Sequence, residues 1–149
     1  MKITKKKFTT VIALTLAAAF LFAGCGDAAK LTEYDFGTDK IPTVNFVIDE
    51  ERKVTGISTG FDNGVQYKQY TYKSDSVFDD LLTYSEYLRG SGWLVIQDYD
   101  LNDSEGELQL ATDSSEAGKI LIISVAFTSG EYAVRINKLE GELTDKEDK

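Results

Sequence analysis

The chain has 149 residues, one cysteine and no histidine, and its 16 basic and 25 acidic side chains give a formal net charge of −9. Without histidine it lacks the usual base of Ser-His-Asp and Cys-His catalysis, and a single cysteine leaves no internal disulfide and no usual zinc ligand set. The acidic balance argues against nucleic acid as a partner, because phosphate contacts need clustered lysine or arginine.

The first 24 residues are typical of a cleaved secretory signal peptide. Four lysines precede an uncharged, mostly apolar stretch from Phe8 to Phe22, which is the layout of such a signal. As a helix this stretch reaches only about 24 Å, less than the roughly 30 Å of a bilayer's hydrocarbon core, so a permanent span is the weaker interpretation. The first 24 residues hold four lysines and no acid, so cleavage leaves 12 basic and 25 acidic residues and a net charge of −13.

The residues before the cysteine, Leu21-Phe22-Ala23-Gly24-Cys25, resemble the lipobox of bacterial lipoproteins. The resemblance implies that the Cys25 sulfur receives a diacylglyceryl group and that a peptidase cleaves between Gly24 and Cys25. Phe22 departs from the commonest pattern, which has leucine there. Two or more acyl chains make attachment stable, so we expect the mature chain to stay on the extracytoplasmic face of the cell membrane. A free reactive thiol, the alternative for Cys25, needs a base or an electropositive setting.

Residues 25–42 are small, polar and weakly periodic, which predicts a tether that begins at the lipidated cysteine. The alternative for its second half is a short edge strand from Leu31 to Phe36. We expect a single α+β domain over residues 43–140 and an acidic, disordered tail over residues 141–149.

Three strands are predicted first in this domain, over residues 44–48, 54–61 and 65–73. Asp62-Asn63-Gly64 favours a tight hairpin between the last two. In the third strand Tyr67 is an odd-numbered position and Tyr70 and Tyr72 are even-numbered positions, so a regular strand would place Tyr67 on one face and the other two on the opposite face. This pattern predicts either a bulge near residues 68–69 or a sheet that is covered on both faces.

One helix follows, over residues 77–89, with Ser76 and Asp79 as an approximate capping box and Gly90 at its end. Its predicted inner stripe is Val77, Leu81, Tyr84 and Leu88, and Phe78, Leu82 and Ser85 are predicted to widen that stripe.

Four more strands are predicted over residues 93–99, 107–112, 119–127 and 131–139, with Trp93 as a core residue and residues 119–127 covered on both faces. The fold class is therefore α+β: a largely antiparallel sheet of about seven strands, in the order βββαββββ, with one helix packed on one face.

Two short runs resemble small surface lipoproteins of Gram-positive bacteria whose function is unknown. They are Tyr84-Ser85-Glu86-Tyr87-Leu88 and, shortly after it, Gly92-Trp93. The resemblance implies no active site.

The densest cluster of oxygen ligands is an acidic loop, and Asp98-x-Asp100-x-Asn102 copies the start of an EF-hand calcium loop. Asp103 then stands in place of the sharp-turn glycine, Gln109 stands in place of the bidentate glutamate, and strands flank the loop. A solvated acidic turn is the competing interpretation, and any calcium binding would be weak. The candidate calcium ligands are Asp98, Asp100, Asn102, Asp103 and Glu105.

A second candidate site is aromatic. Tyr67, Tyr70 and Tyr72 could stack on a sugar or on a partner's side chains, although sheets also use tyrosine as ordinary packing.

These observations favour a non-catalytic, membrane-anchored binding module with no cofactor beyond its lipid. Its partner would be a cell-wall component or an envelope protein. The alternatives are a calcium-binding surface module and a carboxylate-dependent extracellular hydrolase, which would need two converging acids in a pocket.

Overall fold

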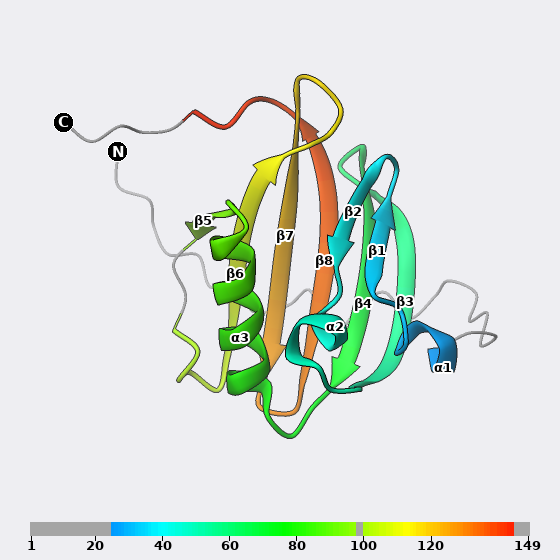
Figure 1. Ribbon diagram of the computed structural model, residues 1–149, viewed down its shortest axis with the longest axis vertical. Helices are drawn as coiled ribbons and strands as arrows, with labels where there is room; N and C mark the ends of the chain where they lie inside the picture. The colour runs from blue at the N-terminus through cyan, green and yellow to red at the C-terminus, as the bar shows by residue number, and fades with distance from the viewer. Residues whose placement is uncertain (1–24, 98–99, 145–149) are drawn as a thin grey trace.

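The computed structural model describes residues 25–97 and 100–144 (Figure 1). The predicted signal peptide, the Gly24 cleavage position and Asp98 therefore lie outside the described residues. Within these ranges, no helix is long and apolar enough to cross a bilayer.

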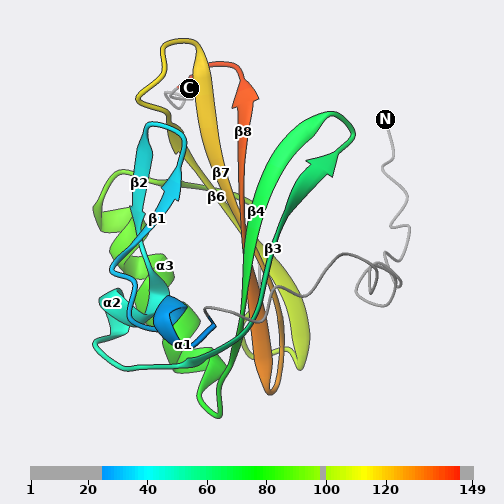
Figure 2. The same cartoon turned by 90° about the vertical axis from the view of Figure 1, so that its right-hand side faces the viewer.

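The main layer is an antiparallel sheet of six strands in the order β3-β4-β8-β7-β6-β5. Figure 2 shows the helices and a separate two-stranded hairpin together on one side of this sheet. The sheet strands are β3 (Lys53–Asp62), β4 (Val65–Lys73), β5 (Leu94–Gln97), β6 (Glu105–Asp113), β7 (Lys119–Thr128) and β8 (Glu131–Glu140). The second layer contains α1 (Cys25–Ala28), β1 (Glu33–Phe36), β2 (Asp39–Pro42), α2 (Val44–Ile48) and α3 (Val77–Gly90).

The predicted α+β class is confirmed, with a mostly antiparallel sheet and α3 packed on one face. Six of the seven predicted strands form. The β3–β4 hairpin turns at Asn63 and Gly64, whose φ angles of 49° and 79° are positive, as the Asn-Gly pair predicts. The predicted inner stripe of α3 is buried, and Trp93 belongs to the core.

The core lies between the sheet and the second layer. In β7 the residues Leu121, Ile123, Val125 and Phe127 are buried, and the residues between them are half-buried. Residues 119–127 do form a central strand, between β8 and β6. The expectation that both of its faces are covered is wrong, because the second layer lies on one side of the sheet. Each large apolar side chain buried in this way contributes about 1.5–3 kcal/mol.

The prediction of a tether over residues 25–42 is wrong for most of that segment. The β1–β2 hairpin buries Tyr34, Phe36 and Ile41 against the sheet, and the Tyr34 hydroxyl lies 2.5 Å from that of Tyr72 in β4. The alternative strand is present over residues 33–36, but it pairs only with β2 and does not extend the main sheet.

The strand predicted over residues 44–48 is instead the short helix α2. The Thr43 hydroxyl accepts a hydrogen bond from the Phe46 amide (3.2 Å) and caps the first turn, and Asp49 ends the helix at a φ of 55°. The Asn45 side chain donates to the carbonyl oxygens of Ala29 (2.9 Å) and Arg52 (3.0 Å). These contacts are specific to the helical conformation, which the alternating apolar pattern did not predict.

Two smaller predictions also need correction. The register of β4 is continuous with both neighbours, and the irregularity lies in β3 between Val54 and Gly56. The Ser76 side chain makes no capping hydrogen bond.

The first residues of the predicted disordered tail are packed. The Gly141 amide donates to the Gly118 carbonyl (2.9 Å), and the Leu143 amide donates to the Asp113 carboxylate (3.4 Å). Residues 145–149 of that tail lie outside the described part of the chain.

Candidate functional site

The three tyrosines of the aromatic candidate site lie on two faces of β4, as their parity predicts. Tyr70 and Tyr72 are 2% and 1% exposed and face the core, where burial raises the pKa of Tyr72 well above its usual range. Tyr67 lies on the opposite face of β4, and the Arg135 guanidinium covers its ring at 4.3 Å from the centroid. The candidate binding role is therefore wrong for Tyr70 and Tyr72, and the alternative interpretation, ordinary packing, holds for them.

The acidic loop forms a self-contained turn over its described residues. The Asp100 carboxylate accepts hydrogen bonds from the backbone amide and the side-chain amide of Asn102, both at 2.9 Å. These bonds hold the pKa of Asp100 below its usual value. Asp103 donates its amide to the Asp100 carbonyl, and Glu105 begins β6. Over residues 25–97 and 100–144, no group of three or more His, Cys, Asp or Glu residues is placed to hold a metal, and calcium binding stays a prediction.

A buried carboxylate on α3 connects this helix to β8, to the residue before β3 and to the residue after β4. Asp80 is 3% exposed, and Arg52 binds it through two hydrogen bonds of 2.8 Å. The hydroxyls of Ser74 (2.6 Å) and Tyr132 (3.2 Å) also donate to this carboxylate. Three of the four donors bind Oδ2 and one binds Oδ1. A buried carboxylate that is paired and hydrogen-bonded in this way serves the fold.

A second charged cluster joins the β1–β2 hairpin to the far end of β8. The Lys138 ammonium lies 2.7 Å from Asp39 and 3.1 Å from Glu116. Burial alone would raise the pKa of Asp39, but the hydrogen bonds from Lys138, the Ser115 amide and the Ser114 hydroxyl outweigh burial and hold that pKa well below its usual range. This cluster also fixes the fold.

The candidate functional surface lies on the other flank of α3. Phe78, Leu82, Glu86 and Arg89 follow one another at spacings of four, four and three residues, which places them on one side of the helix. Phe78 is 41% and Leu82 is 37% exposed. Large apolar side chains that stay exposed in one row, beside a hollow, mark a surface for a partner.

Beside this flank lies β5, the terminal strand of the sheet, whose four residues are all exposed. Val95 is opposite Leu110 and so lies on the face that carries α3, whereas Leu94 is opposite Ala111 on the outer face. An edge strand offers unpaired backbone N–H and C=O groups to another chain. Apolar side chains and free backbone groups are thus adjacent.

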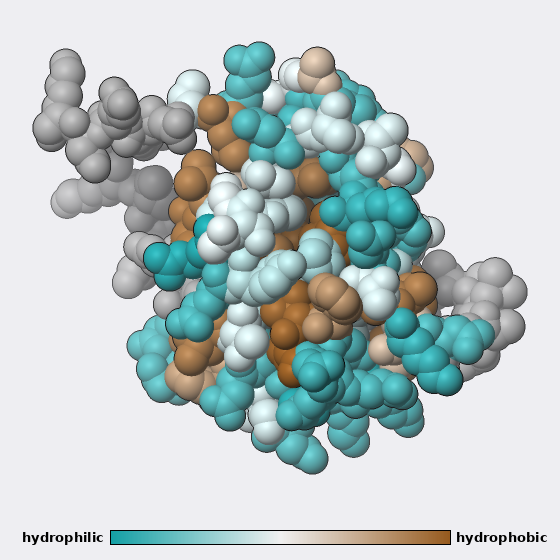
Figure 3. Space-filling model, in the orientation of Figure 1, coloured by the Kyte–Doolittle hydropathy of each residue, from teal (hydrophilic) through white to brown (hydrophobic). Residues whose placement is uncertain are grey.

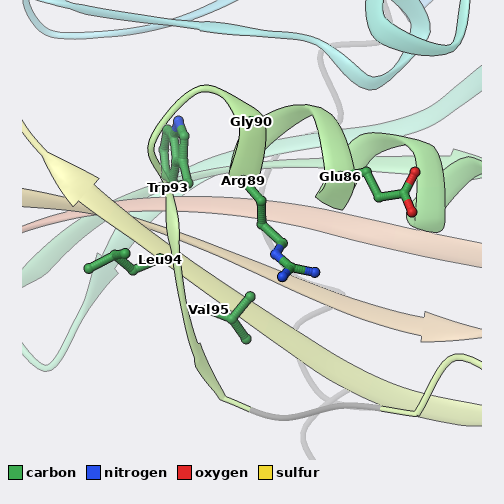
Figure 4. A pocket seen from close by; sticks show the side chains of 6 residues that line it. All are labelled: Glu86, Arg89, Gly90, Trp93, Leu94 and Val95. Atoms are coloured by element: carbon green, nitrogen blue, oxygen red, sulfur yellow. The ribbon is translucent and has the colours of Figure 1, made fainter. Parts of the chain in front are cut away.

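An open hollow of about 510 Å³ lies between the end of α3 and β5, and Figure 4 shows its lining. In this view Arg89 extends from the helix toward Val95, and Leu94 points away. Figure 3 shows hydrophobic patches along the edge of the molecule where β5 lies. The hollow itself is lined by Glu86, Arg89, Gly90, Trp93, Leu94 and Val95. We use the name α3–β5 groove for this hollow together with the exposed Phe78 and Leu82, which extend it along the same flank of the helix.

Within the described part of the chain, no carboxylate pairs with Arg89. Its guanidinium is therefore available as a bidentate donor at the mouth of the groove. Glu86 lies one helical turn away on the same flank. The groove can hold an apolar chain and one carboxylate.

Sequence reasoning missed this groove. It assigned Phe78 and Leu82 to a widened inner stripe and residues 93–99 to an ordinary strand. The apolar run Leu94-Val95-Ile96 was the available signal, but its exposure depends on the position of β5 at the sheet edge. Strand order is a non-local property, which the local pattern does not contain.

Comparisons with protein-family models, with curated proteins and with solved structures find no match for this chain.

Proposed function

We propose that this protein is a lipoprotein, held at the extracytoplasmic face of the cell membrane by acyl chains on Cys25, and that it binds an envelope protein without catalysis. The lipobox-like sequence before Cys25 and the signal-like first 24 residues support the anchor. The observation that carries the binding role is the exposed apolar flank of α3 beside the terminal strand β5.

The proposed occupant of the α3–β5 groove is an extended segment of the partner protein. Such a segment can pair with β5 through main-chain hydrogen bonds, which is the mode called β-strand addition. Alternate side chains of the segment would then enter the groove and meet Leu82 and Val95, because side chains alternate along a strand. Arg89 favours a carboxylate on the partner at this point.

Binding explains the groove better than hydrolysis does. A glycosidase needs two carboxyl groups at a defined separation, whereas Glu86 is the only carboxylate among the described residues that line the hollow. An apolar floor with a single arginine is suited to holding a peptide.

The anchor is tested by the intact mass of the protein extracted from membranes. We expect a chain that begins at Cys25 and carries a diacylglyceryl group. The Cys25→Ser variant should keep its signal peptide uncleaved at this position and lack the lipid. A wild-type protein with a free thiol and residues 1–24 still present would contradict the anchor.

The groove is tested by photocrosslinking in intact cells, with a photoreactive amino acid in place of Leu82. Ile57 on β3, which is apolar and 43% exposed, is the matched control position. We expect adducts at position 82 whose crosslinked peptides all map to one extended segment of an envelope protein. A synthetic copy of that segment should bind the purified protein. Equal adducts at both positions, or a segment that does not bind, would contradict the proposal.

A further inference from the structure

The lipidated end of the chain is packed directly on the domain. Ala28 and Ala29 are buried, and α1 packs against β3. Cys25 is the first residue of α1, and a helix of this length rises only about 5 Å from its first to its last residue. An acyl chain on Cys25 would therefore hold the globular body close to the bilayer surface.

Two side-chain hydrogen bonds fix this segment to the neighbouring helix α2 and its cap. The Asn45 side-chain amide donates to the Ala29 carbonyl (2.9 Å). The Thr43 hydroxyl donates to the Leu31 carbonyl (2.6 Å) and accepts from the Phe46 amide (3.2 Å). One hydroxyl thus joins the backbones of Leu31 and Phe46, so these residues are neighbours on the surface.

Both of these neighbours expose large apolar side chains. Leu31 is 41% and Phe46 is 53% exposed, and Lys30 beside them is also exposed. Figures 1 and 2 show α1 and α2 toward one end of the molecule, with the β3–β4 turn at the other. The anchor and the exposed apolar pair therefore lie at the same end.

We propose that Leu31 and Phe46 form a membrane-contact face, which enters the outer part of the same leaflet as the acyl chains on Cys25. This inference rests on the proposed lipidation of Cys25. It adds to that proposal a fixed orientation of the domain relative to the bilayer. Apolar side chains near an acyl anchor add their buried area to the binding free energy. The contact turns a single attachment point into a defined docking surface.

The charges beside this face indicate which lipids it prefers. Asp49, Glu50 and Glu51 follow α2 directly and are exposed, so anionic headgroups are repelled there. Lys30 offers one ammonium for a lipid phosphate. The contact is therefore mainly apolar, and we expect it on zwitterionic bilayers without any gain from anionic lipid.

This orientation leaves the α3–β5 groove accessible. In Figure 1 the strand β5 and the helix α1 lie on opposite sides of the molecule. A partner segment can thus reach β5 while α1 and α2 face the bilayer.

The test uses spin labels on the full-length protein extracted from membranes and reconstituted into phosphatidylcholine vesicles. Because the sulfur of a lipidated Cys25 is blocked, a new cysteine is the only free thiol. We compare Phe46→Cys and Leu31→Cys with Phe61→Cys, a control near the β3–β4 turn that is 75% exposed. We expect the labels at positions 46 and 31 to lose collisions with a water-soluble nickel chelate and to gain collisions with oxygen, while the label at position 61 stays accessible to nickel.

The outcomes separate this inference from the lipid anchor. If the intact mass shows lipid on Cys25 but the label at position 46 is as accessible to nickel as that at position 61, the membrane-contact face is wrong and the anchor stands. If labels 46 and 31 are immobilised only in native membranes and not in vesicles, the face binds a protein and the inference is also wrong. If the intact mass shows no lipid, both proposals fail.

Discussion

The two flanks of α3 contrast with each other. On the flank that faces α2 and the hairpin, Asp80 has four hydrogen-bond donors, and the Tyr84 hydroxyl donates to the Pro42 carbonyl (3.0 Å). On the flank that faces β5, Phe78 and Leu82 are exposed, and Arg89 has no carboxylate partner among the described residues. One helix thus has a flank committed to the fold and a flank open to a partner.

This difference shows where substitutions should affect stability and where they should affect binding. Buried polar groups that lose their partners destabilise a protein strongly, whereas exposed side chains contribute little to folding. We call the flank that carries Asp80 and Tyr84 the network flank and the flank that carries Phe78 and Leu82 the groove flank. Substitutions on the network flank should change the free energy of unfolding, and substitutions on the groove flank should change the affinity for a partner. A substitution on the network flank that changed only binding, or one on the groove flank that changed only stability, would contradict this difference.

The largest expected effect is alkaline unfolding. Burial raises the pKa values of Tyr34, Tyr72, Tyr84 and Tyr132, with nearby tyrosines and Asp80 adding to the shift. Below the ordinary tyrosine value of about 10 both states are neutral and stability is intact. Above it the unfolded chain loses protons that the folded chain keeps, so stability falls as pH rises. Tyrosinate absorbance and circular dichroism should change together, and a rise in absorbance without loss of structure would contradict this.

The next effect in size is the substitution Asp80→Ala. It removes the acceptor of two Arg52 hydrogen bonds and of two hydroxyls, and it leaves Arg52 only the exposed Glu50 as a partner. Breaking a buried pair costs at most about 3–5 kcal/mol. The neighbouring Asp79 is exposed, so Asp79→Ala is the control and should cost less than about 1 kcal/mol. Urea denaturation measures both. Similar losses in the two variants would remove the special status of the network flank.

The smallest effect on stability, and the largest on binding, is expected for Leu82→Asp. The side chain is 37% exposed, so the free energy of unfolding should change by less than about 1 kcal/mol. The affinity for the segment crosslinked at position 82 should fall at least about tenfold, because a charge would enter the apolar groove. Ile57→Asp on β3 is the control, measured by calorimetry. A variant that binds as tightly as wild type would exclude Leu82 from the interface.

Much of the sheet could be predicted from the sequence because its information is local. Tyr132, Val134 and Ile136 alternate in β8, and Asn63-Gly64 supplies the positive φ angles of a hairpin. The inner stripe of α3 follows the helical period. These patterns need no knowledge of distant residues.

The N-terminal segment and the groove depend instead on distant contacts. Tyr34 is buried against Tyr72, which lies 38 positions later in the sequence, and the two hydroxyl oxygens are 2.5 Å apart. The helix α2 is held by Asn45, which binds Ala29 and Arg52 on either side of it in the sequence. The pattern Val44, Phe46 and Ile48 indicated a strand, and only these contacts select the helix. The groove likewise could not be predicted without knowing that β5 lies at the edge of the sheet.

The most direct test of the binding role is amide hydrogen exchange in residues 94–97, with and without the partner segment crosslinked at position 82. Strand addition predicts slower exchange of β5 amides in the complex, with exchange in β3 unchanged. Protection of β3 with no change in β5 would contradict the account, because the partner would then occupy the opposite edge of the sheet.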